Sequence, residues 1–367
     1  MKRYCLYLFI LIGISCSAEL KAQKNGTVYK GNDPAVRYTG RTLVSPDGSV
    51  AFDWVGTYLE TRFTGGKLSV KVSETGTSYY NVFVDGKLHK VVKVCGTDTL
   101  IHLVSGIDKR IHSLKIQKRS EGEFGKTTVH QFVLSGSGRL AEEPAVRTRH
   151  IEFIGNSLTC GYGTDGKHRD EPFLVETENC NLTFASMVAR YYDADYTLIA
   201  HSGRGAARNY GDSVRVSKVT MKDRMLNTFD EDLTHKWNFK EYRPDLVVIN
   251  LGSNDFSTGL YPLEDEFIRA YTLLINRLRE NYGDIPVLCI SPAIAQRQIV
   301  EYMERMRKEL NDKKVYIAVL PEGLFNVTTD LGAVWHPNYK GQTKMATSLI
   351  PYISTITDWP LKPESFY

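Results

Sequence analysis

Two residues of this chain, Ser157 and His336, stand where a nucleophile and a base would be expected. Ser157 lies in Gly155-Asn-Ser157-Leu-Thr-Cys-Gly-Tyr-Gly163, after an apolar run, on a predicted tight turn from a strand into a helix. Its hydroxyl would then lie at the mouth of a sheet. A serine is also a common helix N-cap, so this motif alone leaves both roles open.

His336 belongs to Trp335-His336-Pro337-Asn338, just before a predicted helix over residues 339–350. Pro337 fixes the backbone beside it. Of the nine histidines, only this one follows the last predicted strand and adjoins both a rigid proline and a helix start. These surroundings favour a positioned base over an incidental histidine.

Two further segments place hydrogen-bond donors after apolar strands. Leu251-Gly-Ser-Asn254-Asp255 offers an amide that can donate to an oxyanion, although an Asn-Asp turn bonding its own backbone is the alternative. We assign Asp255 to organising this loop. The glycines around Gly203, in Ser-Gly-Arg-Gly, allow a backbone N–H to approach a ligand closely, and a flexible loop is the alternative there.

The sequence pattern around these segments predicts a parallel α/β domain over residues 148–360, whose strands and helices would position them. Residues 267, 271, 274 and 278 are apolar or aromatic and share one helical face. Strands that alternate with helices form parallel sheets, and ligands bind beyond the carboxyl ends of the strands. The expected strands are single apolar runs at residues 151–154, 196–200, 246–249, 287–290 and 315–320.

The preceding region, residues 24–140, predicts a β-sandwich of jelly-roll type. Its strand-like runs have a period of two, and Asp85-Gly86 is a strong hairpin signal. Residues 135–144 are rich in small and charged side chains and are typical of a link between domains. The clearest strand-like runs are residues 68–72, 80–84, 114–116 and 129–134.

The composition describes an ordinary globular chain of 367 residues, 42% of them hydrophobic and 24% charged. A net charge of +4 without a dense Lys/Arg block argues against nucleic acid as a partner. Residues 1–22 are typical of a secretory signal peptide, and no segment is long enough to predict an integral membrane span. We expect a secreted or periplasmic protein; lipidation of Cys16 is the less favoured alternative, because Gly13 replaces the usual aliphatic residue.

Four cysteines follow the signal region, and their spacing does not predict a metal site. Cys160 and Cys180 could pair as a disulfide in an oxidising compartment or remain two buried thiols.

The four segments in this order, Gly-x-Ser, Ser-Gly, Gly-x-Asn-Asp and His-Pro, resemble the four blocks of the SGNH hydrolase superfamily. Within it, the long Gly-Asn-Ser-x-Thr-x-Gly-Tyr-Gly variant, the Ser-Gly-Arg-Gly-x-x-Arg-Asn-Tyr loop and the preceding jelly roll look like carbohydrate esterase family two. The resemblance covers nearly the whole chain after the signal region.

The resemblance implies an O-acetylesterase acting on xylan, mannan or related sugars, with a preference for the primary 6-hydroxyl, and without a metal or organic cofactor. Ser157 would be the nucleophile and His336 its base. The backbone N–H groups of Ser157 and Gly203 and the amide of Asn254 would form the oxyanion hole. The oligomeric state stays open.

The chain departs from the superfamily pattern before His336, where Ala333 and Val334 replace the usual Asp. We interpret this as a Ser–His dyad with a backbone carbonyl orienting the ring; Asp330 could complete a triad only if the loop folded back. Because this acid is missing, a polysaccharide-binding protein that has lost its catalytic activity stays an alternative to the esterase. A lipase or thioesterase is another, disfavoured because the loops lack an apolar groove.

Three aromatic residues are candidates for contact with a sugar. Trp335 adjoins the base and could form a stacking wall, whereas Tyr162 and Trp237 are weaker candidates because large aromatics usually belong to the core.

Overall fold

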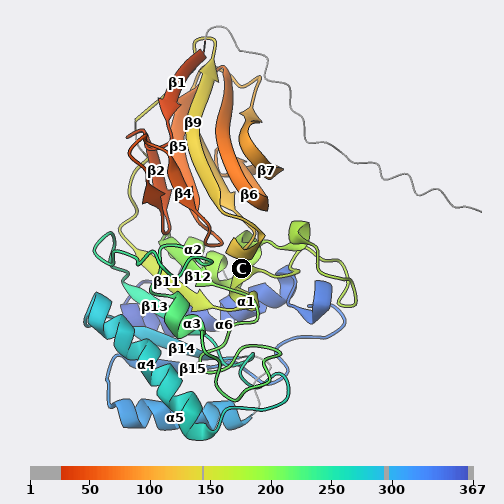
Figure 1. Cartoon of the computed structure of the whole chain (residues 1–367), viewed down its shortest axis with the longest axis vertical. Helices are drawn as coiled ribbons and strands as arrows, with labels where there is room; N and C mark the ends of the chain where they lie inside the picture. Colours follow the sequence, from red (N-terminus) through yellow and green to blue (C-terminus); the bar gives the residue numbers. More distant parts are fainter. Residues whose placement is uncertain (1–25, 143, 293–296, 363–367) are drawn as a thin grey trace, which may run out of the picture.

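Ten antiparallel strands form the N-terminal domain in the computed structural model, which describes residues 26–142, 144–292 and 297–362. They make one sheet that curls around its own apolar core, with the order β10-β5-β8-β6-β9-β4-β3 (Figure 1). β1 pairs with β9, β2 with β5 and β7 with β6. The strands are β1 Gly26–Lys30, β2 Val36–Thr39, β3 Leu43–Val44, β4 Val50–Phe52, β5 Tyr58–Thr64, β6 Lys67–Val84, β7 Lys87–Val104, β8 Ile111–Lys118, β9 Thr127–Ser135 and β10 Arg139–Leu140.

This layout confirms the predicted jelly-roll-like domain and refines it in two places. The runs at residues 68–72 and 80–84 are parts of one long strand, β6, whose register shifts at Glu74. Part of the expected linker is the short strand β10, which pairs with β5. The predicted hairpin joins β6 to β7, and Asp85 and Gly86 have φ of 50° and 75°, as its tight turn requires.

Five parallel strands form the second domain in the order β12-β11-β13-β14-β15, which confirms the predicted flavodoxin-like sheet. The strand that follows β11 in sequence, β12, lies on one side of it, and the later strands lie on the other side. The ligand crevice is therefore expected at the carboxyl end of β11. Each strand lies within one residue of its predicted apolar run. The strands are β11 His150–Gly155, β12 Asp195–Ala200, β13 Leu246–Asn250, β14 Val287–Ser291 and β15 Val315–Val319.

Helices cover both faces of this sheet. α2 and α6 pack on one face, and α3, α4 and α5 pack on the other. The predicted apolar stripe of α4 is buried, as expected, while α6 continues seven residues beyond the predicted end at residue 350. The helices are α1 Ser157–Cys160, α2 Phe184–Tyr191, α3 Met221–Arg224, α4 Glu264–Tyr282, α5 Arg297–Leu310 and α6 Tyr339–Thr357, with short 3-10 turns η1 Gly122–Phe124, η2 Val175–Thr177, η3 Cys180–Leu182 and η4 Ala333–Trp335.

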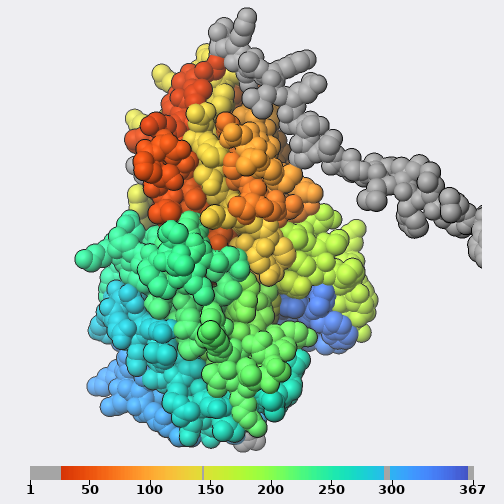
Figure 2. Space-filling model, in the orientation of Figure 1, coloured from red at the N-terminus to blue at the C-terminus, as the bar shows by residue number. Residues whose placement is uncertain are grey.

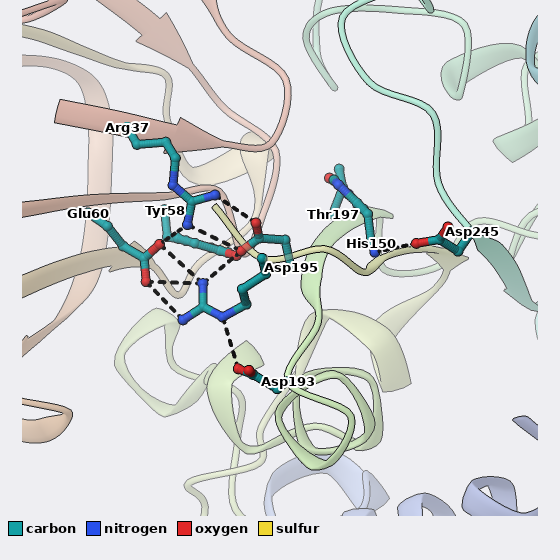
Figure 3. Close-up of polar contacts among 9 residues, drawn as sticks. Arg37, Tyr58, Glu60, His150, Asp193, Asp195, Thr197 and Asp245 are labelled. Atoms are coloured by element: carbon teal, nitrogen blue, oxygen red, sulfur yellow. Dashed lines mark hydrogen bonds and ion pairs between the residues drawn. The ribbon is translucent and has the colours of Figure 1, made fainter. Parts of the chain in front are cut away.

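The sandwich stands directly on the α/β domain, and the two are in close contact along their boundary (Figure 2). Asp195, at the start of β12, accepts hydrogen bonds from Arg37 at 2.6 Å and from Tyr58 at 2.7 Å, both from the sandwich (Figure 3). Arg147, from the link between the domains, reaches the same carboxylate at 2.8 Å and also pairs with Glu60. Buried ion pairs with this many partners fix the orientation of one domain on the other.

The sequence also predicted a signal peptide, no membrane span, and either a disulfide or two thiols at Cys160 and Cys180. The predicted signal peptide lies outside the described residues. Within the described ranges, none of the helices has the length and apolar character needed to cross a bilayer. Cys160 and Cys180 are separate buried thiols in this structure, so the disulfide alternative is not observed.

Candidate active site

Ser157 and His336 meet at the carboxyl edge of the parallel sheet. The hydroxyl Oγ of Ser157 lies 2.9 Å from Nε2 of His336. Asn156, not Ser157, is the N-cap of α1, because its side-chain oxygen accepts the N–H of Leu158 at 3.1 Å. The serine hydroxyl is therefore left for the histidine, which decides between the two roles that the motif left open.

The other ring nitrogen of His336 is held by the backbone of its own loop. Nδ1 lies 2.7 Å from the carbonyl oxygen of Val334, and as an N–H it donates to that oxygen. Val334 and Trp335 both have left-handed backbone conformations, with φ of 50° and 59°. This conformation is costly for a β-branched residue such as valine, and strain of this kind concentrates at functional sites.

Burial lowers the pKa of His336 below its ordinary value, against the raising effects of the Val334 carbonyl and of the charge on Glu121. A neutral imidazole with its proton on Nδ1 presents a bare Nε2 to the serine. This is the protonation state that a general base needs.

Asp330 lies elsewhere and is not placed to complete a triad. Its carboxylate is buried, accepts a hydrogen bond from Lys344 at 2.5 Å, and also accepts from the N–H of Asn326 and the hydroxyl of Thr329. Nδ1 of His336 is already taken by the Val334 carbonyl.

The two donor segments lie together beside Ser157. Asn254 donates one amide N–H to the carbonyl of Arg204 at 2.8 Å, which ties its loop to the residue after Gly203. Gly203 has φ of 75°, a conformation that favours glycine. Asn156 adds a second link, since its amide donates to the hydroxyl of Ser253 at 2.9 Å.

Asp255 organises the glycine-rich loop, as expected. Its buried carboxylate accepts the backbone N–H groups of Ala206, Ala207 and Arg208 at 3.1, 2.6 and 2.9 Å. The assembled site thus contains a hydroxyl with an adjacent base and nearby N–H donors, which is the equipment of acyl transfer through a serine.

Comparison with known proteins agrees with this chemistry. Residues 38–144 match the family described as carbohydrate esterase 2 N-terminal, and residues 153–343 match the GDSL-like lipase/acylhydrolase family. The structure of a family two carbohydrate esterase from Clostridium thermocellum in complex with cellohexaose is 32% identical, with a TM-score of 0.83, covering 89% of this chain and 100% of that one. The chain belongs to carbohydrate esterase family two.

Two curated relatives have names that describe them as esterases. The cellulase/esterase CelE of Acetivibrio thermocellus is 32% identical over 336 residues, which are 89% of this chain and 40% of that longer protein. An acetylxylan esterase/glucomannan deacetylase of Cellvibrio japonicus is 26% identical over 334 residues, covering 89% of this chain and 90% of the relative. This chain is therefore a carbohydrate esterase with a GDSL-like hydrolase domain.

The aromatic residues of this family two esterase differ in how they meet solvent. Trp335 is 51% exposed, with the guanidinium of Arg169 4.3 Å from its ring centroid. Tyr162 is half-buried and stacks on Phe173 with 3.7 Å between centroids, and its own ring lies 4.8 Å from that of His336. Trp335 therefore offers a ring to a ligand, whereas Tyr162 packs against the base.

The prediction that Trp237 could contact a sugar is wrong. It is buried, with its ring 5.4 Å from the guanidinium of Arg41 and 5.8 Å from the ring of Tyr242. Tyr210, to which the sequence motifs assign no role, is 61% exposed and donates its backbone N–H to the Gly203 carbonyl at 2.7 Å. Its position in the Arg-Asn-Tyr part of the glycine-rich motif was the available signal.

Proposed function

We propose that this esterase is exported and removes acetyl groups from sugar hydroxyls of plant-type polysaccharides such as xylan or mannan. The observation that carries the proposal is the 2.9 Å contact between Ser157 Oγ and His336 Nε2 in a chain of carbohydrate esterase family two. The names of the Cellvibrio japonicus relatives, acetylxylan esterase and glucomannan deacetylase, support this choice of substrates.

In the proposed mechanism, His336 takes the hydroxyl proton of Ser157 as the serine oxygen attacks the acetyl carbonyl carbon. The resulting oxyanion is stabilised by the N–H groups of Ser157 and Gly203 and by the second amide N–H of Asn254. The C–O bond to the sugar then breaks, and the imidazolium returns the proton to the departing sugar oxygen. The same histidine then takes a proton from water as the water oxygen attacks the acetyl-enzyme. The bond from the acyl carbon to Ser157 Oγ breaks, the imidazolium returns the proton to Oγ, and acetate is released.

Trp335 is proposed to contact the sugar, because its exposed ring adjoins the base and an aromatic face suits the C–H side of a pyranose. Tyr210 is a second candidate on the side of Gly203.

The test is acetate release from acetylated xylan, acetylated glucomannan and a short synthetic acetyl ester by wild type, Ser157→Ala and His336→Ala. We expect activity in wild type that both substitutions abolish. A wild type that binds these polysaccharides without releasing acetate would contradict the proposal and favour a binding protein. Preference for long-chain esters would favour a lipase.

A further inference from the structure

A carboxylate from the sandwich contacts the loop that carries Gly203. Glu121 lies between β8 and η1 and is completely buried. Its Oε2 accepts the backbone N–H of Ser202 at 2.5 Å, and its Oε1 accepts the hydroxyl of the same serine. The two partners are 81 residues apart in sequence and belong to different domains.

This contact bears directly on the orientation of the Gly203 N–H. That N–H belongs to the peptide unit that begins at the carbonyl carbon of Ser202, so the backbone angles of Ser202 set its direction. Glu121 holds Ser202 at both its N–H and its side chain. Such a two-point, charge-assisted grip leaves the residue little freedom to rotate.

The other supports of the loop come from the α/β domain itself. Tyr210 donates its N–H to the Gly203 carbonyl, and the Asn254 amide donates to the Arg204 carbonyl. Both act on the C-terminal side of the Gly203 N–H. On the N-terminal side, His201 is held by the Gly155 carbonyl and by Asp230 of the α/β domain, and Glu121 adds the contact to Ser202 from the sandwich.

The surroundings of Glu121 also bring it close to α1. One carboxyl oxygen of Glu121, one of Glu178 and the sulfur of Cys160 lie within 4.8 Å of one another, and Cys160 is one turn after Ser157. Glu178 accepts the backbone N–H of Glu121 at 3.1 Å. Since both oxygens of Glu121 already accept from Ser202, we assign this cluster to positioning and not to metal binding.

A buried pair of carboxyl groups avoids two adjacent charges by keeping one proton. Burial, and then the neighbouring Glu121, raise the pKa of Glu178 well above its ordinary value. Both hydrogen bonds from Ser202 go to Glu121, while Glu178 accepts from the backbone of Glu121.

We propose that Glu121 is a positioning residue of the esterase, supplied by the sandwich, which directs the Gly203 N–H toward the carbonyl oxygen of the substrate. This inference rests on the proposed function. It gives the sandwich a part in catalysis that does not depend on whether that domain binds sugar.

The test compares Glu121→Ala, Glu121→Gln and Ser202→Ala in the full chain, with a short acetyl ester as substrate and with thermal unfolding measured for each. Loss of a positioned oxyanion donor should lower kcat about tenfold or more in Glu121→Ala, with KM within about threefold of wild type. Glu121→Gln keeps one acceptor oxygen and should recover part of that loss. Glu280→Gln, at an exposed glutamate on α4, is the control and should behave as wild type.

If Glu121 acts through Ser202, Ser202→Ala removes one of the two hydrogen bonds that Glu121→Ala removes, since the backbone N–H remains. The double variant should then be no slower than Glu121→Ala alone. Additive losses would overturn the inference, as would wild-type kcat in both Glu121→Gln and Ser202→Ala, or a rise in KM at unchanged kcat. Should Glu121→Ala fail to fold, the Gln variant and Ser202→Ala decide the matter. A wild type without esterase activity overturns the proposed function and this inference with it, whereas an active wild type with equally active variants overturns the inference alone.

Discussion

Nδ1 of His336 lies 2.7 Å from the carbonyl oxygen of Val334, two residues earlier in the chain. A carbonyl can accept the ring N–H and so fix the tautomer that leaves Nε2 bare for Ser157. Unlike a carboxylate, it carries no full charge to balance the imidazolium that forms during the reaction. His336, the proposed catalytic base, is thus oriented by its own loop.

The pH dependence of the reaction should reflect the environment of His336. Because burial lowers the pKa of His336 and only the neutral ring can accept a proton, activity should persist below the ordinary histidine value of about 6.5. The measurement is kcat/KM against pH with a short acetyl ester. An acid limb centred above pH 7 would contradict the expectation.

Val334→Gly should separate stability from catalysis. Glycine relieves a left-handed valine that costs roughly 1–2 kcal/mol, so the melting temperature should stay level or rise slightly. The carbonyl that holds His336 is then less constrained, and kcat should fall several-fold. Thermal unfolding and steady-state kinetics on one preparation test both parts; an unchanged kcat would mean that the rest of the loop suffices to hold the carbonyl.

Asn254→Ala should lower kcat by about a hundredfold or more, because it removes a donor to the oxyanion. It also removes the link to Arg204, so the unfolding temperature should be recorded alongside turnover. The matched control is Asn238→Ala, an exposed asparagine in the same domain, which should retain wild-type turnover. Equal turnover in both variants would remove Asn254 from the oxyanion hole.

Trp335→Ala should raise KM for acetylated polysaccharide about tenfold, since a stacking contact of this kind contributes roughly 1–1.5 kcal/mol. The short acetyl ester makes no such contact, and its KM should change little. Tyr352→Ala, at another exposed aromatic position, serves as the control and should alter neither value. Parallel losses on both substrates would indicate that Trp335 supports His336 instead of binding sugar.

Asp330→Asn should reduce stability and leave kcat within about threefold of wild type. Burial opposes the charge of Asp330, but the hydrogen bond from Lys344 prevails and the pKa of Asp330 lies below its ordinary value. A lowered carboxyl pKa stabilises the fold above the unfolded-state pKa, and this stabilisation is lost as the pH falls through the folded-state value. The difference in unfolding temperature between the two proteins should therefore be largest at neutral pH and shrink on acidification. A loss of kcat as severe as that expected for His336→Ala would reinstate Asp330 as a catalytic acid.

The sequence by itself determined the order of the elements and the residues at the ends of the strands. The apolar runs of the α/β domain, the Asp85-Gly86 turn and the face of α4 follow from periodicity and turn chemistry, which are local properties of the chain. Ser157 and His336 were recognisable because each follows a strand in a parallel sheet, and such ends meet at one edge.

Only the tertiary structure decided which groups form hydrogen bonds with Ser157 and His336 and hold the loops around them. Asn156, and not Ser157, caps the helix. The Val334 carbonyl, and not Asp330, accepts the ring N–H of His336. Trp237 is buried against Arg41 of the sandwich. The contact of Glu121 with Ser202 joins two domains across 81 residues. Contacts of this kind depend on how the domains pack and on strained backbone angles, and neither leaves a periodic signal in the sequence.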